Sequence, residues 1–141
     1  MISKSIMRTF SAVAIVLILL ISVIPNSANA SSKVSLNQDF NSMQIFIKAL
    51  NSYGVICNPY KKNAEVLIVT EEGVCKTPSG DLTLDIFPTD KVMNQVIGSE
   101  ASMMKSFGAT YTANKNWSIV VFSVATGNSV SKLLRLEFKN S

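Results

Sequence analysis

Residues 81–97 read DLTLDIFPTDKVMNQVI, and the spacing of the apolar residues in this stretch changes at Pro88. Before the proline, apolar and polar residues alternate, which predicts a strand over residues 81–87 with one buried side and one solvent-facing side. After it, apolar residues recur at steps of three and four, which predicts a helix that begins at Thr89 or Asp90. The stretch therefore indicates a domain that contains both a sheet and helices.

The chain before this stretch predicts one helix and two further strands. A capping pattern at Ser35 and apolar residues at three- and four-residue steps predict a first helix that ends before Gly54. The apolar run at residues 65–70 predicts a strand that is buried on both faces. After a turn at residues 71–73, residues 74–77 are expected to return beside it as the second strand of a hairpin.

The chain after this stretch predicts a second hairpin and a last helix. Residues 109–112 and 117–124 have the composition of two strands, and Asn128 or Ser129 can cap the helix that follows. The order is helix, three strands, helix, two strands, helix. It predicts an α+β domain in which a mainly antiparallel sheet of about four or five strands carries helices on one face.

The first thirty residues have the three parts of a secretory signal peptide. A basic segment and a thirteen-residue apolar segment precede the small residues Ala28 and Ala30, and cleavage is expected after Ala30. An uncleaved anchor is the alternative, but a membrane-spanning helix needs roughly 20 apolar residues. We therefore predict a signal peptide over residues 1–30 and one secreted domain over residues 31–141, which meets the membrane only during export.

Cys57 and Cys75 are the only cysteines, and both belong to the exported part of the chain. An even number of cysteines in an oxidising compartment predicts one disulfide, with a single possible pairing. A redox or metal-binding role is the alternative. The spacing is not C-x-x-C, and the chain has no histidine to complete a metal site. The sequence therefore predicts a structural disulfide and no metal.

Charge and composition exclude several classes of function. The chain has 13 basic and 9 acidic residues, and its net charge is +4. Loss of Lys4 and Arg8 with the signal leaves 11 basic and 9 acidic residues, a net charge of +2 that does not indicate nucleic-acid binding. The absence of histidine excludes His-based triads. No phosphate-binding glycine motif occurs among the six glycines, so we predict no cofactor.

Two arrangements could support catalysis without histidine. Asp81 and Asp85 fall on one side of the predicted strand, but four residues of strand separate them by about 13 Å, more than the roughly 5–9.5 Å between glycosidase carboxyls. Ser102 and Lys105 have the S-x-x-K spacing, but a Ser–Lys pair needs a buried lysine. Lys105 is expected near a helix end, where a cation is favoured in any case. We therefore predict no catalytic residues.

The tip of the second hairpin is the candidate recognition site. Its residues are Tyr111, Lys115, Asn116 and Trp117. Tyrosine and tryptophan are enriched at interfaces, because they offer a large contact area. The alternative is that Trp117 begins a central strand and packs in the core. The helix after Pro88 carries three methionines, which are typical of core packing or, as the alternative, of an adaptable binding surface: Met93, Met103 and Met104.

Four segments together resemble small exported proteins and lipoproteins of actinobacteria. They are GVIC at residues 54–57, EGVC at 72–75, LTLDIF at 82–87 and FGATYTANKNWSIVV at 107–121. The resemblance covers roughly residues 38–135. It implies an exported protein with no assigned activity and therefore no catalytic residues. The chain departs from the lipoproteins because no cysteine lies near the cleavage site, which puts membrane tethering in doubt.

The sequence as a whole predicts an exported, non-enzymatic binding or accessory protein that acts at the cell surface or in the extracellular medium. Its partner is expected to be an envelope or extracellular protein or peptide. One alternative is a small secreted hydrolase that uses serine, lysine and carboxylate chemistry. The other is an envelope protein tethered to the membrane by an uncleaved signal anchor.

Overall fold

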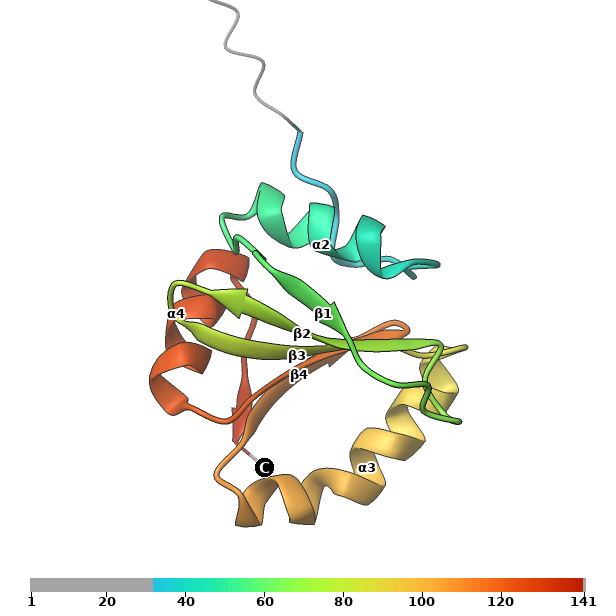
Figure 1. Ribbon diagram of the computed structural model, residues 1–141. Helices are drawn as coiled ribbons and strands as arrows, with labels where there is room; N and C mark the ends of the chain where they lie inside the picture. Colours follow the sequence, from blue (N-terminus) through green and yellow to red (C-terminus); the bar gives the residue numbers. More distant parts are fainter. Residues whose placement is uncertain (1–31, 141) are drawn as a thin grey trace, which may run out of the picture. The chain divides into compact units, whose positions relative to one another are not determined.

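A six-stranded antiparallel sheet and three helices make up residues 32–140, the part of the chain that the computed structural model describes (Figure 1). The helices are α2 (Met43–Ser52), α3 (Asp90–Ser106) and α4 (Val124–Leu134). The strands are β1 (Tyr60–Lys62), β2 (Glu71–Thr77), β3 (Gly80–Ile86), β4 (Thr110–Asn114), β5 (Trp117–Val121) and β6 (Lys139–Asn140). Their order in the sheet is β1-β2-β3-β5-β4-β6. The α+β class is confirmed, and the described residues hold one strand more than the upper expectation.

One face of the sheet carries the larger core, which α2 and α4 cover. The alternation in β3 is confirmed on this face, where Leu82, Leu84 and Ile86 are buried. Trp117 from β5 and Phe46 from α2 pack in the same core, and their ring centroids lie 5.0 Å apart. The apolar side of β3 therefore joins helices that are distant in sequence.

The opposite face carries a second, smaller core under α3, so the expectation of helices on one face is wrong. Met93 and Ile97 of α3 pack with Val120 of β5 on this side. Figure 1 shows α2 and α3 on opposite sides of the sheet. The predicted solvent-facing side of β3 is covered as a consequence, and Asp85 is only 7% exposed. The alternation in β3 correctly predicts which residues share a face, but it does not predict that α3 covers the polar face.

Two predictions between α2 and β3 are wrong. Residues 65–70 form a loop instead of a buried strand, and Val66 and Ile68 in it are exposed. The expected turn at residues 71–73 is instead the beginning of β2. Both differences follow from strand pairing, because β1 and not the 65–70 segment pairs with β2, and Gly73 lies opposite Lys62 in that pairing.

Helix α2 begins later than its capping pattern predicted, and helix α4 begins earlier. Ser42, not Ser35, caps α2, and its hydroxyl accepts a hydrogen bond from the amide of Ile45. Ser35 instead accepts a bond from the amide of Asn37 in the segment before the helix. That segment crosses the larger core, where Phe40 is buried. Burial of the lead-in therefore outweighed the local capping preference.

The caps of α3 and α4 show the same contrast. The Thr89 hydroxyl accepts a hydrogen bond from the Val92 amide, so the predicted start of α3 is confirmed. Helix α4 is capped by Ser123 and not by Asn128 or Ser129, since β5 ends earlier than expected, at Val121. Gly98 lies within α3, and the helix continues through it.

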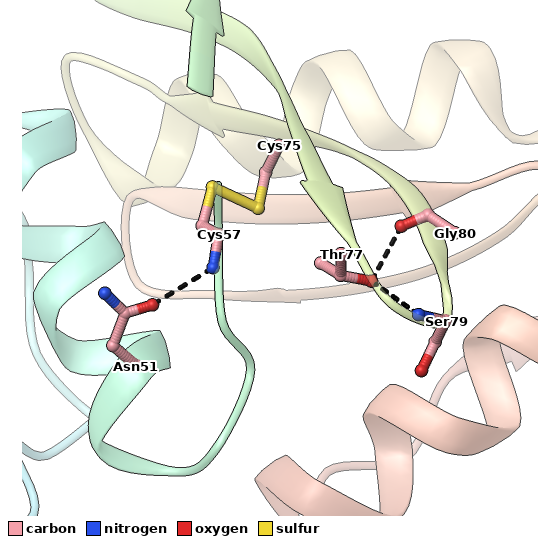
Figure 2. The surroundings of a disulfide bond; sticks show 6 residues. All are labelled: Asn51, Cys57, Cys75, Thr77, Ser79 and Gly80. Carbon is pink, nitrogen blue, oxygen red and sulfur yellow. Dashed lines mark hydrogen bonds between the residues drawn. A yellow bond between two sulfur atoms is a disulfide. The ribbon is translucent and has the colours of Figure 1, made fainter. Parts of the chain in front are cut away.

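The predicted disulfide between Cys57 and Cys75 is present (Figure 2). Their Cα atoms are 5.2 Å apart, and the bond joins the segment after α2 to the middle of β2. The Asn51 side chain accepts a hydrogen bond from the Cys57 amide at 3.2 Å and holds this segment against the helix. The hydroxyl of Thr77 bonds the Gly80 carbonyl at 2.7 Å and closes the turn between β2 and β3.

No helix within residues 32–140 is long and apolar enough to cross a membrane. The predicted signal peptide, with the cleavage residues Ala28 and Ala30, lies outside the described residues.

Candidate ligand-binding pocket

Trp117, the expected centre of the recognition site, is fully buried in the larger core. Its indole N–H donates to the Leu36 carbonyl at 3.1 Å, and its ring packs against Phe46. A buried indole with its single donor satisfied is a core residue. The structure therefore favours the alternative reading of Trp117.

The other three hairpin residues do not make a common exposed surface. The buried Asn116 amide accepts from the Phe40 amide at 2.8 Å and donates to the carbonyls of Phe40 and Phe87. Tyr111 is half-buried against the core under α3, and only Lys115 is fully at the surface. Lys115 has a positive φ of 52°, as the tight β4–β5 turn requires. The hairpin tip thus fastens the lead-in segment to the sheet.

A pocket of about 380 Å³ lies between α3 and the sheet, within the volume range of small-molecule sites. Strands β3 and β5 provide Thr83, Asp85 and Val120, and the 65–70 loop and α3 form the sides. The lining is mostly apolar and consists of Val66, Ile68, Val69, Glu72, Thr83, Asp85, Phe87, Val96, Ile97, Glu100, Met103, Met104, Phe107, Val120 and Phe122.

Several lining side chains of this pocket are large, apolar and exposed. Phe107, just after α3, is 67% exposed, and Phe122, just after β5, is 64% exposed. Val66, Ile68 and Met103 add three more exposed apolar side chains to the lining. Apolar side chains that gather around a concavity mark an interaction site more strongly than the same residues scattered singly.

Asp85 places a buried carboxyl group in this apolar lining. Its Oδ2 atom accepts a hydrogen bond from the Ser118 hydroxyl at 2.7 Å. Burial, as the largest cause, and the nearby charges of Glu72 and Glu100 together raise the pKa of Asp85 to about 7, against the lowering effect of the Ser118 hydrogen bond. A carboxyl group with a strongly perturbed pKa in a pocket is a candidate functional group.

The residues considered for catalysis are not brought together. Ser102 and Lys105 are exposed on α3 and do not line the pocket. Asp81 is exposed, while Asp85 is buried on the same strand. Within residues 32–140, no group of three or more His, Cys, Asp or Glu side chains could hold a metal ion.

The sequence does not predict the pocket, although it identifies several of the apolar residues that line it. The composition of residues 65–70 predicts a buried strand, whereas Val66, Ile68 and Val69 line the pocket. Of the three methionines on α3, Met93 and Met104 are buried, as core packing predicts, and Met103 is exposed in the lining. Core packing is therefore confirmed for two of the three methionines, and the adaptable binding surface stays a prediction for Met103.

Comparison with known proteins gives no significant match to any family model, curated protein or solved structure. The resemblance to exported actinobacterial proteins therefore stays a prediction.

Proposed function

We propose that the protein is an exported, non-enzymatic binding protein and that the pocket between α3 and the sheet takes a small apolar molecule. The observation that carries the proposal is the apolar pocket with exposed Phe107 and Phe122 in its lining. Burial of one such side chain is worth about 1.5–3 kcal/mol. A ligand that covers both side chains would therefore gain substantial free energy. Because the two side chains line a concave pocket, a small molecule fits them better than the flat surface of a protein partner.

Binding of a neutral apolar dye, Nile red, tests this proposal. We expect its fluorescence to rise on addition of the oxidised protein, with saturation at one site. Phe122→Ser should weaken binding about tenfold, since it removes one large apolar contact. Val124→Ser is the matched control, because Val124 is also exposed but does not line the pocket. Absence of saturable binding, or equal loss in both variants, would contradict the proposal.

Export from the cytoplasm is the second part of the proposal. The disulfide supports it, because such bonds persist in oxidising compartments. The intact mass of the native protein in the medium and envelope fractions tests it. We expect a species that begins at Ser31 and is two hydrogens lighter than its reduced form. A full-length species confined to the envelope would instead support the membrane-tethered alternative.

A secreted hydrolase remains the second candidate, and the observation that favours it is Asp85. A pKa of about 7 suits a group that transfers protons near neutral pH. Hydrolysis of p-nitrophenyl acyl esters above the background rate, abolished by Asp85→Asn, would support an enzyme. Nile red binding without any such hydrolysis would support the binding protein.

A further inference from the structure

We infer that the natural ligand of the pocket is a cationic amphiphile, a free small molecule with an apolar chain and a protonated amine beside Glu72, Asp85 and Glu100. The inference rests on the proposed function and adds the chemical class of the ligand. Its basis is the charge of the pocket in relation to its apolar lining.

The charged residues of the pocket are all acidic. Glu72 comes from β2, Asp85 from β3 and Glu100 from α3, and no lysine or arginine is among the lining residues. Composition does not explain this, because residues 31–141 contain more basic than acidic side chains. Glu72 lies directly opposite Asp85 in the pairing of β2 with β3, and the charges of Glu72 and Glu100 both raise the pKa of Asp85.

Asp85 has an acceptor available for a ligand. Its only hydrogen bond within residues 32–140 is the one from Ser118 to Oδ2, which leaves Oδ1 without a donor. Glu72 is held in place by Asn63, whose side-chain amide donates a hydrogen bond to the Glu72 carboxylate. A primary ammonium group has three donors, and one of them can bond Oδ1 of Asp85, while the charges of Glu72 and Glu100 attract the cation.

The apolar residues of the lining indicate that the remainder of the ligand is an apolar chain. Phe87 and Val120 are buried next to Asp85 in the lining, and Met103 and Phe107 extend it toward solvent. An anionic amphiphile such as a fatty acid would bring its carboxylate beside three others, which like-charge repulsion disfavours. A neutral chain would remove water from the carboxyl groups without replacing their hydrogen bonds. A cationic amphiphile satisfies both parts of the lining.

Displacement of Nile red by three probes with the same chain tests the inference: dodecylamine, dodecanol and dodecanoate. We expect dodecylamine to bind at least about tenfold more tightly than dodecanol, and dodecanoate to bind most weakly. Equal affinity for the three probes, or preference for dodecanoate, would overturn the cationic ligand and leave the proposed function intact. Failure of all three probes and of Nile red would overturn the proposed function itself.

Two variants show whether the preference arises in the pocket. Glu100→Gln changes an exposed side chain on α3, so the fold should be retained. We expect it to lower the affinity for dodecylamine severalfold and to leave that for dodecanol unchanged. Glu137→Gln is the matched control, since Glu137 is exposed and does not line the pocket. Equal effects of both variants on dodecylamine would assign the preference to the net charge and overturn the inference.

Discussion

Asp85 is a residue whose negative charge conflicts with the demands of folding. It lies on β3 under α3, with one hydrogen bond from Ser118, and its pKa is raised from 3.8 to about 7, mainly by burial. As the pH rises above 3.8, the unfolded chain loses this proton before the folded chain does. The free energy of unfolding therefore falls between these two pKa values and levels off above about 7.

Asp85→Asn should remove this pH dependence. Three pKa units correspond to about 4 kcal/mol, so we expect the variant to be more stable than the parent by about 2–4 kcal/mol at pH 8. At pH 4 the two should be similar. Urea unfolding at both pH values measures the difference, with Asp81→Asn as an exposed control on the same strand. A variant less stable than the parent at pH 8 would show that the charge of Asp85 is not a cost to the fold.

Asn116 is the second residue with a disproportionate structural role. Asn116→Ala would leave the Phe40 amide and the carbonyls of Phe40 and Phe87 without their partner. Each buried group left unpaired costs about 1–3 kcal/mol, so we expect a loss of about 3 kcal/mol in urea unfolding. Asn114→Ala is the control in the same hairpin, because its contact to Asn37 is long, at 3.5 Å, and exposed. Equal losses in the two variants would contradict the role given to Asn116.

At the scale of elements, the sequence predicted what local pattern determines and missed what tertiary contact determines. The strand at β3, the start of α3 at Thr89 and the disulfide follow from alternation, capping and cysteine number, and all three are confirmed. The run at 65–70 has the composition of a strand, but β1 takes the place beside β2. The pocket could not be predicted, because it exists only where α3 covers the face of β3 that holds Asp85.

The packing of β1 on β2 depends on Gly73. A Cβ atom at Gly73 would clash with the ring of Tyr60. Gly73→Ala should therefore displace that ring and lower the free energy of unfolding by about 1–3 kcal/mol. Gly98→Ala is the matched variant, since nothing lies within 4 Å of its Cβ position in α3. It should stabilise the helix by up to about 1 kcal/mol. Thermal unfolding distinguishes the two, and a change of the same sign in both would contradict this account.

At the scale of the whole molecule, the disulfide joins β2, the second strand of the sheet, to the segment after α2. The bond closes a sequence separation of 18 residues. A loop of this size is worth about 3 kcal/mol in the chain-entropy model. We expect the double variant Cys57→Ser, Cys75→Ser to lose about this amount in urea unfolding. The parent protein under reducing conditions should match the variant, and an unchanged midpoint on reduction would refute the stabilising role.

The sheet divides the molecule into two unequal halves, and the division has a consequence for its motions. The half with α2 and α4 holds the larger core, whereas α3 borders an open pocket over the smaller core. Backbone amides of α3 should therefore exchange with deuterium through local opening, while those of β3 and β5 exchange only on global unfolding. A ligand should slow exchange in α3 and leave the other helices unaffected. The pocket is thus bordered by the half of the protein that has the smaller core.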